Sequence, residues 1–162
     1  MILPKEHIIK AKIVTEFIDE SQFQPCGVDL TLKEVLSLDD AGKIDFDNKE
    51  RKLSANTLVP FANDEVLLKR GAYKIKYNEY VSIPDDCAAF GYTRSSLLRC
   101  GAMVGCAVWD PGYHGRSESL LIVENPHGIV LKKNAKVVQL VFVKLAEKAT
   151  QLYSGQYKGE NK

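Results

Sequence analysis

The sequence lacks the features that would assign it to several large classes of protein. Its four cysteines and three histidines show neither Cys-x-x-Cys nor His-Glu-x-x-His spacing, which argues against a zinc site. The first seven residues carry charges where a signal peptide needs an apolar core, and no apolar run approaches the roughly 18 residues of a membrane span. We therefore expect a reduced, soluble, cytoplasmic protein without a membrane partner.

A marked excess of one charge is also missing. The chain has 22 Lys plus Arg against 21 Asp plus Glu, whereas a protein that binds duplex nucleic acid needs a basic surface to displace phosphate counterions. Nucleic acid is therefore not the expected partner. Residues 1–70 carry 10 basic and 13 acidic side chains, and residues 71–162 carry 12 and 8, so a small anion site is expected in the second part.

Helical patterns are scarce. After Pro4, apolar residues at near-helical spacing predict one short helix between about residues 4 and 13. Further along, short β-rich runs alternate with turn residues and form one domain up to about residue 150. The expected strands are Val28–Leu32, Leu53–Phe61, Glu65–Leu68, Tyr73–Ile83, Ala88–Tyr92, Ser119–Val123 and Val137–Leu145. Regular short strands without intervening helices favour an all-β sandwich or barrel.

Two segments fall outside this strand pattern. Residues 38–52 hold nine charged side chains and few large apolar ones, so we expect a solvated loop or exposed hairpin that carries no chemistry. The tail, residues 151–162, has no aliphatic side chain after Leu152. Such a tail is either a frayed terminus or a flexible arm that orders over a ligand.

One segment has the composition of an anion site. Arg94, Ser95, Ser96 and Arg99 place two guanidinium groups and two hydroxyls within six residues. Guanidinium is a planar fork of donors that matches phosphate oxygens, and serine adds short-range donors. The alternative is a turn with surface arginines.

A second segment, residues 105–115, has the composition of a site for a flat ligand. Its small residues let the backbone approach such a ligand, and Trp109 and Tyr113 flank a turn that contains one carboxylate, Asp110. A general base must lie within hydrogen-bond reach of a water, which spacing alone does not show. The alternative is a plain β-turn at Asp110-Pro111-Gly112.

Taken together, five stretches resemble the motifs of the dUTPase and dCTP deaminase superfamily, in the same order, between about residues 24 and 160. They are Gln24-Pro25-Cys26-Gly27-Val28-Asp29-Leu30, Arg94-Ser95-Ser96-Leu97-Leu98-Arg99, Val108-Trp109-Asp110-Pro111-Gly112-Tyr113-His114-Gly115, Asn134-Ala135-Lys136-Val137-Val138-Gln139-Leu140 and Tyr153-Ser154-Gly155-Gln156-Tyr157-Lys158-Gly159. The chain looks closest to archaeal-type dUTPases of the deaminase branch. The resemblance implies a distorted, jelly-roll-like β-barrel with a short N-terminal helix, a homotrimer with active sites at subunit interfaces, and Mg²⁺ as cofactor.

The resemblance also implies roles for individual residues. Asp110 would be the catalytic base, Tyr113 would pack on the deoxyribose, and Asp29 would support the water shell of Mg²⁺ without ligating the ion, which phosphate oxygens and waters would hold. The phosphates would be bound by Arg94, Ser95, Ser96, Arg99 and Gln139, and the pyrimidine edge by the backbone around Gly105, Ala107 and Val108. The arm would contribute Tyr153 and Lys158, although Lys158 stands two positions from the usual basic residue, and Lys136 replaces the usual Arg.

The choice between hydrolase and deaminase depends on one strand. Deaminases of this superfamily use a glutamate there, and the two ways of counting place Leu120 or Ile122 at that position. Glu118 and Glu124 lie about 7 Å away along a strand, unless a bulge shifts the register. The favoured function is hydrolysis of dUTP to dUMP and pyrophosphate, which removes dUTP and supplies dUMP for thymidylate synthesis. The alternatives are a dCTP deaminase, a bifunctional enzyme, or a catalytically silent nucleotide-binding regulatory module.

Overall fold

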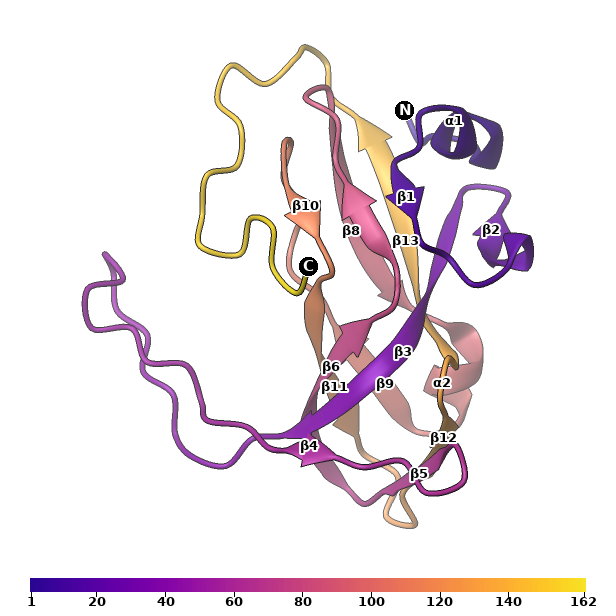
Figure 1. The fold of residues 1–162 in the computed structure, drawn as a ribbon, viewed down its shortest axis with the longest axis vertical. Helices are drawn as coiled ribbons and strands as arrows, with labels where there is room; N and C mark the ends of the chain where they lie inside the picture. Colours follow the sequence, from indigo (N-terminus) through magenta and orange to yellow (C-terminus); the bar gives the residue numbers. More distant parts are fainter.

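The computed structural model describes residues 1–162 and consists mostly of short strands wound into a nearly closed barrel (Figure 1). The strands are β1 (Val14–Thr15), β2 (Phe23–Gln24), β3 (Gly27–Ser37), β4 (Leu58–Val59), β5 (Glu65–Leu68), β6 (Gly71–Tyr77), β7 (Tyr80–Ser82), β8 (Cys87–Thr93), β9 (Ala102–Gly105), β10 (His114–Gly115), β11 (Glu118–Val123), β12 (Ile129–Lys132) and β13 (Lys136–Lys144). The helices are α1 (Lys5–Lys10), the 3₁₀ turn η1 (Glu20–Gln22) and α2 (Ser95–Arg99). The expected β-barrel class is confirmed.

The main sheet has eight strands, with β8, β13, β3, β6, β11 and β9 side by side and β2 and β4 added to β3. The two outermost strands of that path, β8 and β9, approach each other. The Thr93 hydroxyl at the end of β8 accepts a hydrogen bond from the Val104 N–H (2.9 Å) and donates one to the Val104 carbonyl (3.1 Å) on β9. These two hydrogen bonds link the two ends of the strand path.

Smaller sheets and the N-terminal segment complete the barrel. The sheets pair β1, β7 and β10, and β12 with β5. Alternate residues of β11 point inward, so that Ser119, Leu121 and Val123 are buried. Ile8 of α1 is fully buried too, and β3 is therefore buried along most of its length.

Some element boundaries differ from the sequence prediction. The N-terminal helix ends at Lys10, and only Leu58–Val59 of the expected strand 53–61 is a strand. The expected strand 73–83 is broken at Asn78 and Glu79, because the Asn78 N–H bonds back to β3 and Glu79 turns into the core. The helix α2 and the strands β1, β2, β9, β10 and β12 were not predicted; β1, β2 and β10 have two residues each, which is too short for a periodic pattern.

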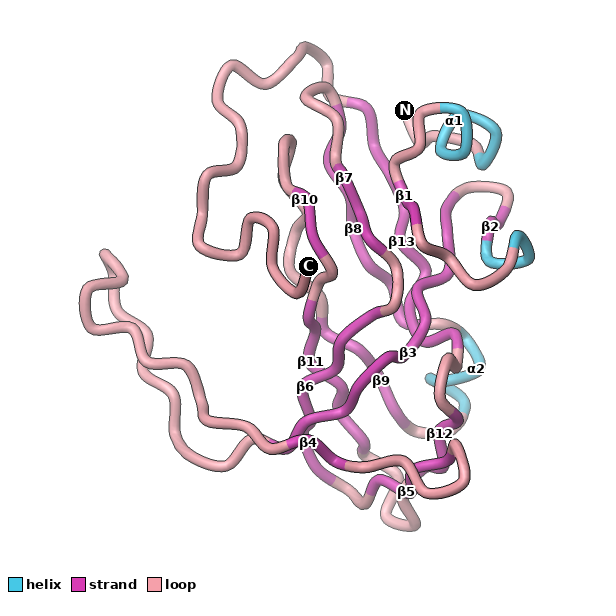
Figure 2. Tube along the Cα trace, in the orientation of Figure 1, coloured by secondary structure: helices cyan, strands magenta, loops and turns pink.

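Two long segments lie outside the barrel strands and on the same side of it. Residues 38–57 form an extended hairpin that projects beyond β4, and residues 145–162 form an arm that runs back along the barrel; Figure 2 shows both as loops. The hairpin was expected to be exposed, and it is. Neither α-helix has the length or the apolar character that crossing a membrane would require.

Candidate functional site

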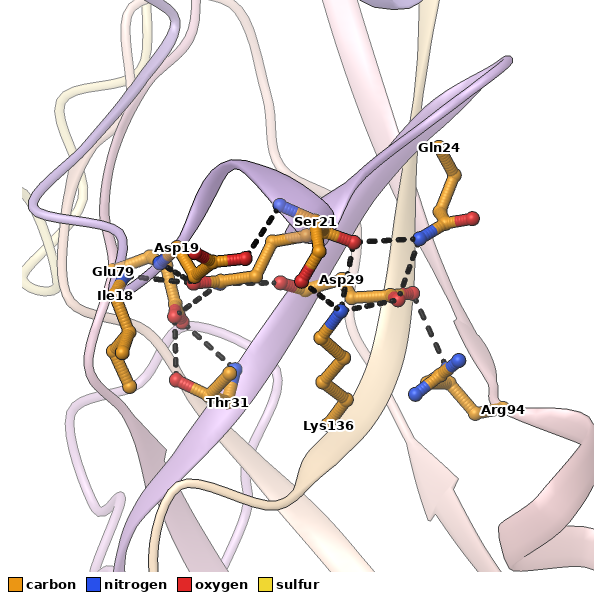
Figure 3. A network of polar contacts seen from close by, with 10 residues as sticks. Ile18, Asp19, Ser21, Gln24, Asp29, Thr31, Glu79, Arg94 and Lys136 are labelled. Carbon is orange, nitrogen blue, oxygen red and sulfur yellow. Dashed lines mark hydrogen bonds and ion pairs between the residues drawn. The ribbon is translucent and has the colours of Figure 1, made fainter.

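One candidate region is a buried carboxylate surrounded by cationic and amide side chains (Figure 3). Asp29 on β3 has no exposed surface. Its Oδ1 lies 3.3 Å from the Arg94 Nε, and its Oδ2 lies 3.9 Å from the Lys136 Nζ and accepts a hydrogen bond from the Gln24 Nε2 at 3.1 Å. Burial raises the pKa of the Asp29 carboxyl, and Arg94 and Lys136 oppose that rise. Three of the five motifs meet at this group, which we call the anion cluster: Gln24, Asp29, Arg94 and Lys136.

A second buried carboxylate supports the anion cluster from behind. Glu79 has no exposed surface, and its oxygens accept hydrogen bonds from the Thr31 N–H (2.9 Å), the Thr31 hydroxyl (2.5 Å) and the Gln22 amide (2.7 Å). The same Gln22 amide also donates to the Asp29 carbonyl at 2.8 Å. Burial raises the pKa of the Glu79 carboxyl. The backbone from the Asp29 carbonyl to the Thr31 N–H is therefore fixed to a buried polar network.

The remaining predicted phosphate residues lie around this cluster. Gln139 on β13 pairs directly with Asp29 across the sheet. Ser95, Ser96 and Arg99 lie on α2, where they are exposed and make no side-chain hydrogen bond or ion pair within the chain. The buried Leu97 anchors α2 to the barrel, so the hydroxyls and the second guanidinium remain free to bind a ligand.

Most of the other predicted residues line a pocket of about 580 Å³. Its walls are Leu38, Leu53, Ser54, Lys74, Ala107, Val108, Trp109, Asp110, Tyr113, Ser117, Glu118, Ser119, Tyr153, Tyr157 and Glu160. Ala107, Val108, Asp110, Tyr113 and Tyr153 were predicted site residues. Gly105 lies at the end of β9 and outside this lining, and Lys158 is exposed on the arm and does not line the pocket.

Asp110 is the free carboxylate of the pocket. Trp109 is buried and pairs with Ala89 of β8 through two backbone hydrogen bonds of 3.0 Å, which fixes where the turn begins. The turn is closed by the Tyr113 N–H, which donates to the Asp110 carbonyl at 3.1 Å. The Asp110 side chain is exposed and makes no hydrogen bond or ion pair with the protein, so it is available to a water or a ligand.

Tyr113 is held at the back of the pocket. Its hydroxyl lies 3.0 Å from the Ser117 Oγ and donates to the Glu160 Oε1 at 2.8 Å. Its ring packs edge to face against Tyr153, with the ring centroids 5.7 Å apart. Burial raises the pKa of the Tyr113 hydroxyl far above its ordinary value, so the group is a neutral donor. The arm thus covers the aromatic residue predicted to face the sugar.

The strand that distinguishes hydrolases from deaminases, β11, carries a glutamate that forms ion pairs with two lysines. β11 pairs with β6 in unbroken register from Glu118 to Val123, so no bulge moves Glu118 or Glu124 toward the Leu120 position. Glu118 forms an ion pair with Lys74 at 2.8 Å, and the Lys76 ammonium lies at 3.8 Å. Leu120 pairs with Gly105 of β9. Leu120 and Ile122, the two positions at which the sequence resemblance places the deaminase glutamate, are both apolar.

The anion cluster and the pocket lie apart within one chain. Trp109 pairs with Ala89, and Arg94 follows five residues later along the same strand path, up to about 17 Å away at 3.3–3.4 Å per residue. None of Asp29, Arg94, Ser95, Ser96, Arg99 and Gln139 lines the pocket. The structure of the single chain does not bring these two sets together.

Several pocket residues were not predicted. Lys74, on β6, and the hairpin residues Leu38, Leu53 and Ser54 reach the pocket only through pairing between distant strands, which leaves no local signal. The sequence motifs indicate Glu118 only as a displaced counterpart of the deaminase glutamate. The one available signal was its position at the start of β11, directly after the Asp110 turn.

The chain thus combines a β-barrel with an anion cluster and a pocket that contains an unpaired carboxylate. Residues 4–145 match the dCTP deaminase-like family, and the chain belongs to that family, as the five motifs indicated. Among its relatives is a protein of Methanosarcina mazei named probable deoxyuridine 5'-triphosphate nucleotidohydrolase, which is 50% identical over 88% of this chain and 84% of its own length. A Methanocaldococcus jannaschii protein named deoxyuridine 5'-triphosphate nucleotidohydrolase is 42% identical over 94% of this chain and 99% of its own.

Solved structures agree on the fold. The crystal structure of 2'-deoxycytidine 5'-triphosphate deaminase from Agrobacterium tumefaciens superposes with a TM-score of 0.62 at 18% identity. The match covers 87% of this chain and 47% of that one. At this level of identity the match supports the fold alone.

Proposed function

We propose that the protein hydrolyses dUTP to dUMP and pyrophosphate, which removes dUTP and supplies dUMP for thymidylate synthesis. The observation that carries the proposal is the unpaired Asp110 carboxylate at the pocket, combined with an apolar Leu120 where a deaminase would need a glutamate. The names of the archaeal relatives support the same activity.

In this mechanism Asp110 orients a water and takes its proton as the water attacks the α-phosphorus in line, with pyrophosphate as the leaving group. Arg94, Arg99 and the two serines of α2 bind the phosphates, and Gln139 assists from β13. Tyr113 packs against the deoxyribose, and the backbone from Gly105 to Val108 contacts the pyrimidine. Apart from Asp110, these residues act by positioning or by charge, because phosphoryl transfer needs little covalent help from the protein.

Mg²⁺ is the cofactor that this donor set fits. The structure has no group of three or more His, Cys, Asp or Glu side chains that could hold a metal ion, so a caged metal does not fit. The Asp29 Oδ1 is buried and accepts no hydrogen bond, and only the Arg94 Nε lies beside it, at 3.3 Å, which suits a contact with a water of an ion held mainly by phosphate oxygens. When bound, Mg²⁺ neutralises charge on the phosphates.

Deamination of dCTP is disfavoured by the state of Glu118. Its carboxylate already forms ion pairs with the Lys74 ammonium at 2.8 Å and the Lys76 ammonium at 3.8 Å, so it is not a free group on the strand. The Asn161 side chain donates to the same carboxylate at 3.2 Å. No other carboxylate on β11 lies near the Leu120 position.

We further propose that a complete site forms between copies of the chain in a homotrimer. The separation of the anion cluster from the pocket supports this arrangement, because one chain does not supply both parts of a triphosphate site. The outer strands β8 and β9 also expose Phe90, Tyr92 and Met103, with 39, 62 and 44% of their surface accessible. Aromatic and Met side chains are enriched at protein interfaces, so these residues are candidate contacts between copies.

Product analysis tests the proposed function. The protein is incubated with dUTP or dCTP and Mg²⁺, and nucleotides, pyrophosphate and ammonia are measured. We expect dUMP and pyrophosphate from dUTP and no ammonia from dCTP. Release of ammonia from dCTP would contradict the proposal, and binding of dUTP without turnover would identify a silent binding module instead.

A further inference from the structure

The hairpin formed by residues 38–57 is a wall of the pocket as well as an exposed segment. Leu38, Leu53 and Ser54 line the pocket opposite the Asp110 turn. The expectation of a solvated segment without chemistry concerned residues 38–52, of which Leu38 alone lines the pocket, whereas Leu53 and Ser54 follow that segment. Its charges lie on the solvent side, while these three residues near its base face the pocket.

Hydrogen bonds along its length stiffen the hairpin. Lys43 and Lys52 exchange two backbone hydrogen bonds of 2.7 and 2.9 Å, and the Asp39 N–H donates to the Ala55 carbonyl at 2.9 Å. The Asp40 carboxylate accepts the Ala55 N–H and the Lys52 ammonium, both at 2.6 Å. A hairpin with these internal hydrogen bonds can serve as a fixed surface for another segment of the chain.

The C-terminal arm contacts this surface through one residue. A guanidinium N–H of Arg51 donates a hydrogen bond to the Gln156 Oε1, and the Arg51 guanidinium carbon lies 6.0 Å from the centre of the Tyr157 ring. Tyr157 itself lines the pocket. Arg51 is thus the link between the hairpin and the part of the arm that covers the pocket.

We propose that the hairpin is the docking surface of the C-terminal arm and that Arg51 is a positioning residue, which sets how the arm closes over bound nucleotide. Arg51 acts through Gln156 and Tyr157 and touches neither the substrate nor Asp110. A planar guanidinium can donate to an amide oxygen and lie against a ring at the same time, which a lysine ammonium does less well. The expected effect on KM rests on the proposed function, whereas the docking of the arm on the hairpin does not.

Proteolysis tests the docking without nucleotide. The Gly159 N–H donates to the His114 carbonyl at 2.6 Å, so cleavage of the Lys158–Gly159 bond by trypsin requires the arm to leave the barrel. We expect Arg51→Ala to release residues 159–162 about three to ten times faster than wild type, and Arg51→Lys to lie between the two. The matched control is Lys49→Ala, because Lys49 lies on the same hairpin and pairs only with Asp47.

Kinetics supply the second readout. Because a weakly populated closed state lowers apparent affinity in proportion to its population, we expect Arg51→Ala to raise KM for dUTP about three- to tenfold and to leave the protein's melting temperature unchanged. Cleavage and KM both equal to those of Lys49→Ala would overturn the inference. If the wild type does not hydrolyse dUTP, the proposed function fails while the cleavage rates still decide the docking.

Discussion

The anion cluster and the pocket are built in opposite ways. Asp29 and Glu79 are fully buried, and backbone and side-chain donors hold them from several directions. The pocket, in contrast, is closed on one side by the hairpin and the arm, through contacts such as Arg51 with Gln156 that lie at the surface. One part is fixed by the core, and the other is assembled from segments outside it.

This difference indicates different roles for the anion cluster and the pocket. A preorganised cluster binds charge without rearrangement, so it suits phosphates whose geometry does not vary. A pocket closed by surface segments can open to admit a nucleoside and then exclude water. Changes in the cluster should therefore alter stability and phosphate binding together, whereas changes in the covering segments should alter entry and closure.

The largest effect is expected from Asp110→Asn in the pocket. The Asp110 side chain makes no hydrogen bond or ion pair within the protein, so its loss should not affect folding, whereas removal of a general base costs about 10²–10⁴-fold in turnover. The measurements are kcat for dUTP and the affinity for a non-hydrolysable dUTP analogue, which should remain close to that of wild type. Turnover that survives the change would show that Asp110 is not the base.

The second effect concerns the stability of the cluster. In Glu79→Gln an amide NH₂ replaces one acceptor and faces the donors of Thr31 and Gln22, so we expect the free energy of unfolding to fall by about 1–3 kcal/mol. Denaturant unfolding measures it. The control is Glu124→Gln, which removes an exposed ion pair with Arg70 and should cost less than about 1 kcal/mol. Equal stability of the two variants would contradict the view that the cluster is fixed by its buried network.

The smallest effect is a pH dependence of arm docking. Burial, and the nearby Glu118, raise the pKa of Glu160 in the docked arm above its ordinary value. The docked state therefore binds more protons than the free arm, and docking weakens as pH rises from the ordinary glutamate pKa through the raised value. Glu160→Gln keeps an acceptor for Tyr113 and does not titrate.

Hydrogen exchange of residues 151–162 measures this effect. At neutral pH the arm of Glu160→Gln should exchange more slowly than that of wild type, and the difference should shrink as pH falls toward the ordinary glutamate pKa. Intrinsic exchange rates cancel in the ratio of the two proteins at each pH. Faster exchange in the variant at every pH would contradict the assigned direction.

Local sequence patterns predicted individual strands and the family of the chain. Glu65–Leu68 is a strand with the expected limits because alternation and turns mark it, and the five motifs indicate the family because each is a short run of neighbouring residues. Glu79 had no such signal. It stands in a polar Asn78-Glu79 turn, and its burial depends on Gln22 and Thr31, which lie 57 and 48 residues away. Pairing of that range is set by the whole fold.

The hairpin illustrates the same limit at the site. Its charged composition indicated an exposed segment, and that was right. Its contribution to the pocket depends on where β3 and β4 direct it and on where the arm returns, about a hundred residues later in the chain. Composition predicts which side chains face water, but it does not predict which surface segments meet.

We propose that each active site combines the anion cluster of one chain with the pocket of another. Mixing two inactive variants tests it most directly. Arg94→Gln lacks the cluster guanidinium, and Asp110→Asn lacks the base. After co-expression at equal amounts, random trimers should recover activity at about a quarter of the sites, because each site can draw its two intact parts from different chains. Activity no higher than that of the separate variants would show that both parts act within one chain, and would contradict the account.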